Sequence, residues 1–240
     1  MNRNVRITDN IDEIREYQRQ GIPCILVLND KNSGLDTSCA KYCALLDEDI
    51  TSEDKAREIL GDAYLDLVEA RALGKPLIIS SSDRIIIREL TIDDAEAIYD
   101  LYENSNTHFL EDFYDSKEEA RAIISRYIND VYDFYGYGLW AVTLRENEKV
   151  IGIVGFTPRD SSDEVMDIEL GYAIHPDFQQ KGYGLEAAMA AVNYAKENIE
   201  YGKILINVEK GNIQGERLGN KIQVLTTDVL FCSIDGAERD

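Results

Sequence analysis

The chain has 240 residues, which is enough for one large domain or two small ones. Its hydrophobic fraction of 44% supports a packed core and argues against global disorder. The formal net charge of −21 disfavours binding to nucleic acid through a basic face, so no nucleic-acid partner is expected.

No apolar run approaches the length of a membrane span, and the N-terminus shows no signal-peptide pattern. A cytoplasmic protein without a membrane partner is therefore expected. The four cysteines form no C-x-x-C pair and the chain contains two histidines. Free thiols are expected rather than a structural zinc site, and no metal site is predicted.

Two domains are predicted, residues 1–82 and 83–240, because the stretch GKPLIISSSD combines turn residues, a short apolar run and three serines. In the first domain a β-α-β pattern predicts a small parallel sheet of the Rossmann-like type. Its expected elements are strands over 5–8, 22–28 and 42–46, a helix over 11–19 capped by Asn10 or Asp9, and a helix over 52–73 with Gly61 as a break. No activity is predicted for this domain.

The second domain reads as a meander of strands followed by a β-α-β-α order, which predicts an α/β protein with a mixed, α+β type of sheet. Strands are expected over 84–90, 139–144, 149–156, 165–174 and 203–208, with the last strands within 222–232. Helices are expected over 91–103, 116–128, 185–199 and 214–221. Capping boxes Thr91-x-x-Asp94 and Ser116-x-x-Glu119 mark the starts of the first two helices.

The most informative stretch is GYAIHPDFQQKGYG at 171–184, whose core has the form Q-x-x-G-x-G. It joins an apolar strand to an amphipathic helix. A strand that turns through glycines into a helix gathers unpaired backbone N–H groups where the helix dipole adds positive potential. Gly182 and Gly184 allow close approach to the backbone, and Lys181 adds a mobile cation. The pattern predicts a phosphate-binding turn, although a plain helix start would give the same letters.

Residues 84 to about 224 resemble the GCN5-related N-acetyltransferase (GNAT) superfamily, and most closely the branch that includes the ribosomal-protein N-terminal acetyltransferases. The matching segments are IIIRELTIDDAEAIYDLY (85–102), YGYGLWAV (135–142), KVIGIVGF (149–156), IELGYAIHPDFQQKGYG (168–184) and VEKGNIQGERLGNKI (208–222). The resemblance implies a GNAT acyl-CoA N-acyltransferase fold for the second domain. It also implies an acetyl-CoA-dependent N-acetyltransferase that acts by direct attack of a primary amine.

The resemblance further implies where acetyl-CoA binds. The turn would hold the pyrophosphate, the end of the central strand would hold the pantetheine arm, and the N–H of Ile174 would polarise the acetyl carbonyl. Asn212 matches an asparagine that helps to orient CoA. The implied cofactor-binding residues are Tyr172, Ala173, Ile174, Gln179, Gln180, Lys181, Gly182, Tyr183, Gly184 and Asn212.

Glu169 is the predicted general base. Residues 167, 169, 171 and 173 share one face of a strand, so Asp167 and Glu169 lie together and Gly171 leaves room beside them. Two neighbouring carboxylates would raise one pKa towards neutrality, and many GNAT relatives carry a glutamate at this position. An exposed acidic face or a salt-bridged residue is the alternative interpretation.

The last part of the matched region departs from the family. Gly215 stands where serine or alanine is usual, Gly219 replaces a tyrosine that many members use as general acid, and Gln223-Val224 replaces Gly-Phe. The proton donor is thus open, with Tyr172 and Tyr183 as candidate substitutes. A non-catalytic acyl-CoA-binding or interaction module is therefore the alternative function.

The acceptor is expected to be a small-molecule or peptide amine. Most of the negative charge falls on residues 83–240, which would steer a cationic acceptor, although solubility alone explains an acidic surface equally well. The segment 106–114 is a candidate specificity loop, and Trp140 either lines an acceptor pocket or packs in the core. The sequence is compatible with a homodimer as well as with a monomer, because it does not determine the oligomeric state.

Overall fold

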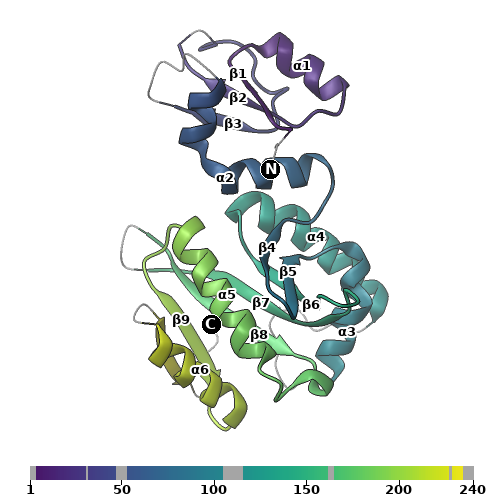
Figure 1. Cartoon of the computed structure of the whole chain (residues 1–240), viewed down its shortest axis with the longest axis vertical. Coiled ribbons are helices and arrows are strands. Elements are labelled where there is room, and N and C mark those ends of the chain that lie inside the picture. The colour runs from purple at the N-terminus through teal and green to yellow at the C-terminus, as the bar shows by residue number, and fades with distance from the viewer. Residues whose placement is uncertain are drawn as a thin grey trace. The chain divides into compact units, whose positions relative to one another are not determined.

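The computed structural model describes residues 4–30, 32–46, 53–104, 116–161, 165–226 and 229–234. The chain divides into two compact units, residues 1–77 and 78–240 (Figure 1). The division lies a few residues before the expected junction at 82/83. The reason is that β4 (Ile78–Ser81) pairs with β5 (Ile85–Glu89) and so joins the sheet of the second unit.

The first unit is the predicted small parallel sheet. Its strands β1 (Arg6–Thr8), β2 (Cys24–Leu28) and β3 (Cys43–Leu45) are neighbours in that order, and both pairs are parallel. The helices are α1 (Ile11–Arg19), whose start Asn10 caps, and α2 (Glu53–Ala72). Gly61 breaks α2 with φ 74° and ψ 161°, as its position in the sequence predicts.

Successive side chains of β2 point to opposite faces of the strand and so belong to two small cores in this unit. Ile25 and Val27 pack with α2, and Cys24 and Leu26 pack with α1. A parallel strand that is covered on both faces carries apolar residues without interruption. The continuous apolar run CILVL meets this requirement.

The second unit is built on one seven-stranded mixed sheet, which confirms the predicted fold class. The strand order is β10-β9-β8-β7-β6-β5-β4. The pairs from β4 to β8 are antiparallel, whereas β8–β9 and β9–β10 are parallel. The remaining strands are β6 (Leu139–Leu144), β7 (Val150–Arg159), β8 (Asp167–Ile174), β9 (Ile204–Glu209) and β10 (Val229–Ile234).

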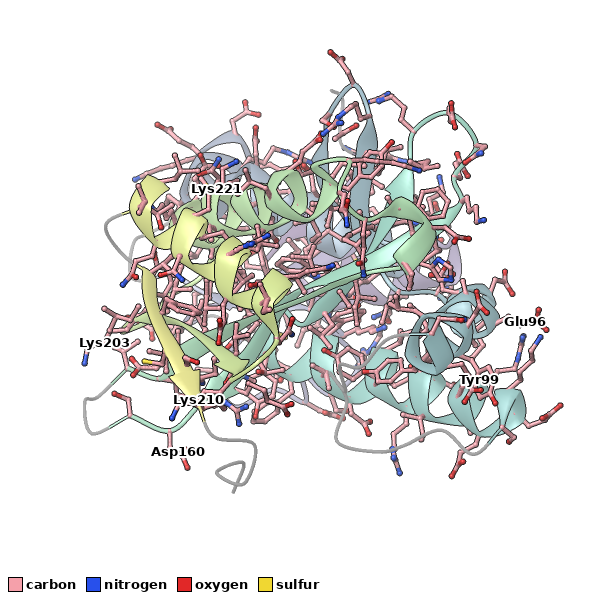
Figure 2. The ribbon with its side chains drawn as sticks, turned by 90° about the horizontal axis from the view of Figure 1, so that it is seen from below. Glu96, Tyr99, Asp160, Lys203, Lys210 and Lys221 are labelled. Carbon is pink, nitrogen blue, oxygen red and sulfur yellow. The ribbon has the colours of Figure 1, made fainter. Side chains whose placement is uncertain are left out.

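Helices cover both faces of this sheet. The helices are α3 (Ala95–Asn104), α4 (Lys117–Tyr135), α5 (Tyr183–Asn198) and α6 (Ile213–Leu225). Figure 2 shows α5 and α6 on one side of the sheet, and α3, which carries Glu96 and Tyr99, on the other side with α4. The 3-10 turn η1 (Ile92–Asp94) precedes α3 and contains the predicted Thr91–Asp94 capping box, and Ser116 caps α4 as expected.

Several predicted boundaries need correction; for example, the strand expected to end at Phe156 continues as β7 to Arg159. The segment expected to supply the last strands begins as helix, because α6 continues to Leu225 and places Ile222 in the core. The strand β10 starts only at Val229. In addition, α4 runs past Ile128 to Tyr135, where Gly136 ends it in a left-handed conformation.

A prediction concerns Gly155 on β7. A Cβ atom at this position would lie 2.0 Å from the carbonyl oxygen of Gly138 and 2.8 Å from the Cα atom of Leu139. Because both neighbours are backbone atoms, Gly155→Ala should lower the free energy of unfolding by more than about 2 kcal/mol. Urea denaturation followed by circular dichroism measures this change. The control is Gly136→Ala, where φ is also positive but no atom lies within 4 Å; a similar loss in both variants would contradict the clash.

Candidate active site

The strands β8 and β9 separate after a short paired segment. The register pairs between β8 and β9 are Ile168 with Ile204 and Glu169 with Leu205, and within the described residues no further pair follows although β8 continues to Ile174. On its other edge β8 pairs with β7 along its whole length. The stretch in which β8 and β9 are no longer register partners is called the wedge below.

Backbone groups of β8 face the wedge at alternate residues. The N–H of Ile168 donates to the carbonyl oxygen of Lys203 at 2.9 Å, so the backbone of Ile168 faces β9. Because successive residues of a strand direct their N–H and C=O groups to opposite sides, Tyr172 and Ile174 face the same way. Ala173 faces β7 instead, opposite Ile153. The carbonyl oxygen of Ile174 accepts a 2.8 Å hydrogen bond from Nε2 of Gln179.

The turn from β8 into α5 contains two left-handed residues. After the 3-10 turn η2 (Pro176–Phe178), Gln180 has φ 59° and Gly182 has φ 86°. We call residues 179–184 the phosphate turn. The side chain of Lys181 is not the mobile cation that the sequence suggests, because Nζ donates to the carbonyl oxygen of Asp177 at 2.8 Å and anchors it.

The N-terminus of α5 has no side-chain cap among the described residues. Gly182 occupies the cap position and carries no side chain to accept from the first N–H groups. By contrast, Asn10, Ser116 and Asn212 cap α1, α4 and α6 with side-chain oxygens. The first N–H groups of a helix need an external acceptor when no cap is present. An anion meets this need and is also favoured by the helix dipole.

Gly184 brings the phosphate turn close to both α6 and the wedge. A Cβ atom on Gly184 would lie 3.2 Å from Cδ2 of Leu218 on α6 and 3.6 Å from Cγ1 of Ile174 on β8. The start of α5, the end of β8 and the middle of α6 therefore meet at one place. The structure thus brings together the predicted phosphate turn and the predicted pantetheine strand.

Glu169 lies at the closed end of the wedge. Its Oε2 accepts from Nε of Arg159 at 2.7 Å and from Nδ2 of Asn207 at 3.0 Å. Within the described part of the chain, no group bonds to Oε1, and 17% of the side chain is exposed. Glu169 therefore forms an ion pair with Arg159, which agrees with the alternative interpretation of Glu169 as a salt-bridged residue. The other predicted carboxylate, Asp167, is buried and its Oδ1 lies against Gly202.

Asn212 and Tyr172 meet at the N-terminus of α6. Oδ1 of Asn212 accepts from the N–H of Gly215 at 3.0 Å, and the hydroxyl of Tyr172 donates to the carbonyl oxygen of Gly215 at 3.3 Å. Burial raises the pKa of Tyr172, so its phenol keeps its proton. The position of Gly219 cannot accept a larger side chain, because a Cβ atom there would lie 2.5 Å from Cδ2 of Phe231. The ring of Phe231 therefore packs directly against Gly219.

Three residues near the site had no recognisable signal in the sequence. Arg159 and Asn207 bond to Glu169 from different strands, and Arg84 contacts the phosphate turn from a position 97 residues before Lys181. Only the tertiary arrangement brings these side chains to their partners. Trp140 is 1% exposed and its ring packs 5.3 Å from that of Tyr194, so it belongs to the core. The predicted specificity loop 106–114 lies outside the described residues.

A strand that loses its neighbour beside a glycine-rich helix start is the arrangement that the sequence resemblance implies for an acyl-CoA acyltransferase. The family model described as "Acetyltransferase (GNAT) domain" matches residues 84–223. The chain therefore belongs to the GNAT acetyltransferase family, whose members transfer acyl groups from acetyl-CoA, and it is an N-acetyltransferase.

Relatives support this assignment. The uncharacterized N-acetyltransferase YnaD of Bacillus subtilis is 26% identical over 143 residues, which are 59% of this chain and 79% of YnaD. The uncharacterized N-acetyltransferase YoaA of the same organism is 27% identical over 143 residues, covering 58% of this chain and 78% of YoaA.

Solved structures share the fold. One of RimL, a ribosomal L7/L12 alpha-N-protein acetyltransferase, has a TM-score of 0.51 at 17% identity and covers 61% of this chain and 80% of RimL. A GNAT-family acetyltransferase from Bordetella pertussis has a TM-score of 0.50 at 14% identity. The match covers 60% of this chain and 86% of the Bordetella protein. None of the helices in the described ranges combines the length and apolar character needed to cross a membrane.

Proposed function

We propose that this protein moves the acetyl group of acetyl-CoA to a primary amine by direct attack of the amine on the thioester. One observation carries the proposal: the wedge and the uncapped start of α5 lie side by side, so that one extended anionic ligand can occupy both. The acceptor is a small-molecule or peptide amine.

In this proposal the pyrophosphate of CoA accepts hydrogen bonds from the N–H groups of the phosphate turn. The residues that form this part of the site are Gln179, Gln180, Lys181, Gly182, Tyr183 and Gly184. The pantetheine arm lies along the free edge of β8 at Tyr172, Ala173 and Ile174, where outward-facing backbone groups bind it as a strand would be bound. The N–H of Ile174 donates to the acetyl carbonyl, which gains negative charge during the attack. Asn212 holds the start of α6 against this arm.

Glu169 is the proposed general base. Two donors fix Oε2, so Oε1 is oriented and available as a proton acceptor. Glu169 lies five residues before Ile174 on β8, about 16 Å at the rise of an extended strand, so the proton of the attacking amine reaches Oε1 through water. The nitrogen then forms the amide bond while the bond between the carbonyl carbon and sulfur breaks. The amine proton moves to Glu169 and the CoA thiolate takes up a proton from solvent.

Calorimetry with acetyl-CoA and the full chain tests the proposal. We expect micromolar affinity with one site per chain, followed by release of free CoA thiol when a suitable amine is added. A folded protein that does not bind acetyl-CoA would contradict the proposed function.

A second function has one observation in its favour. Residue 219 is a glycine that packs against Phe231, so the chain lacks at this position the tyrosine that the family resemblance leads one to expect as proton donor. An acyl-CoA-binding module without turnover would fit this loss. Acetyl-CoA binding without thiol release across a broad panel of amines would favour this second function over catalysis.

A further inference from the structure

Arg84, just before β5, contacts the phosphate turn at several points. Its Nη1 donates to the carbonyl oxygen of Lys181 at 3.1 Å. Its guanidinium lies 4.8 Å from the ring centroid of Tyr183, and its Nη2 would lie 3.6 Å from a Cβ atom on Gly182. The turn is therefore supported from one side by a planar cation.

Arg84 is itself held in a fixed orientation. Its Nε donates to Oε2 of Glu186 at 2.9 Å, and Nη2 forms an ion pair with the same oxygen. The hydroxyl of Ser82 donates to Oε1 of Glu186 at 2.6 Å. Because Glu186 holds the Nε side of the guanidinium, Nη1 is directed at the turn.

The hydrogen bond to Lys181 has a consequence for the next residue. In a planar trans peptide the C=O of one residue and the N–H of the next point in opposite directions. Arg84 holds the C=O of Lys181, so the N–H of Gly182 must point away from Arg84. The left-handed conformation of Gln180, which is unfavourable for a residue with a Cβ atom, is part of the same backbone arrangement.

We infer that Arg84 is a positioning residue that aims the Gly182 N–H at the pyrophosphate of CoA. This inference rests on the proposed function and adds a residue that directly precedes β5 to the cofactor site. Arg84 acts through the peptide between Lys181 and Gly182 and does not need to touch the ligand. Without it, this peptide is free to rotate and the phosphate turn loses one aligned donor.

The test compares Arg84→Met with wild-type protein in the full chain. We expect CoA to bind about tenfold more weakly, because one hydrogen bond to a charged group is lost. The pantetheine arm alone has no phosphate, so its affinity, measured by ligand-observed NMR, should change less than twofold. CoA should also shift the Gly182 amide resonance of 15N-labelled wild-type protein, and this shift should be smaller in Arg84→Met.

Arg145→Met is the matched control, because Arg145 donates to Ser82 and Ser81 in the same corner without contacting the turn. It should bind CoA like wild type. Equal CoA affinity in Arg84→Met and wild type would overturn the inference and leave the proposed function intact. Equal losses for CoA and the pantetheine arm, with a lower Tm, would also overturn it, since general damage to the fold would then explain both. Absence of CoA binding in wild type would overturn both proposals.

Discussion

Glu169→Gln should lower turnover by about 100-fold or more and leave the affinity for acetyl-CoA unchanged. Glutamine keeps the size of the side chain and an oxygen that Arg159 and Asn207 can bond, but it cannot accept a proton at neutral pH. The loss should therefore appear in kcat and not in the binding constant of the donor. Release of CoA thiol with an accepted amine measures kcat, and calorimetry measures affinity.

The pH dependence separates base catalysis from a structural role of Glu169. As the pH rises, a larger fraction of the amine is neutral without help, so the difference between variant and wild type should shrink. A difference that stays constant with pH would indicate that Glu169 only holds Arg159 and Asn207 in place. Equal kcat for both proteins at neutral pH would exclude Glu169 as the base.

Gly182→Val should weaken acetyl-CoA binding by at least about tenfold. Gly182 has φ 86° and ψ −1°, a conformation that a β-branched residue strongly disfavours. Relief of this strain would rotate the backbone of the phosphate turn, and the added side chain would also approach Arg84. Calorimetry on the variant and on wild type gives the two dissociation constants.

The control for this variant is Gly136→Val. Gly136 has nearly the same backbone conformation, φ 74° and ψ −4°, but lies at the end of α4 and far from the turn in sequence. Both variants should lose similar thermal stability, and only Gly182→Val should lose affinity for acetyl-CoA. If Gly136→Val lost affinity to the same degree, the effect would reflect general destabilisation and not the turn.

Local sequence signals predicted most of the fold. Capping residues such as Asn10, Thr91 and Ser116 start helices where expected, and Gly61 breaks α2. These features depend on contacts between residues close in sequence, which a pattern reveals directly. The end of α6 was less predictable, because Ile222 is apolar and suits a buried helix position as well as a strand.

The surroundings of Glu169 could not be predicted, since they depend on the register of three strands. The sequence places Asp167 on the same face of the strand, but it does not indicate that Arg159 of β7 and Asn207 of β9 reach the same carboxylate. Similarly, the glycine at 219 is visible in the sequence, whereas its packing against Phe231 is not. Contacts across a sheet depend on the tertiary arrangement and carry no short-range signature.

The short pairing between β8 and β9 has a consequence for the lifetime of the folded protein. Two register pairs connect β9 to the rest of the sheet, and β10 connects through β9. If the proposed function is correct, the pantetheine arm of acetyl-CoA occupies the wedge between β8 and β9 and bonds to the edge of β8 as an additional strand would. Occupancy then stabilises the folded state by mass action, in proportion to the logarithm of donor concentration over its dissociation constant. The supply of acetyl-CoA would set how long the C-terminal part of the sheet resists local opening and proteolysis.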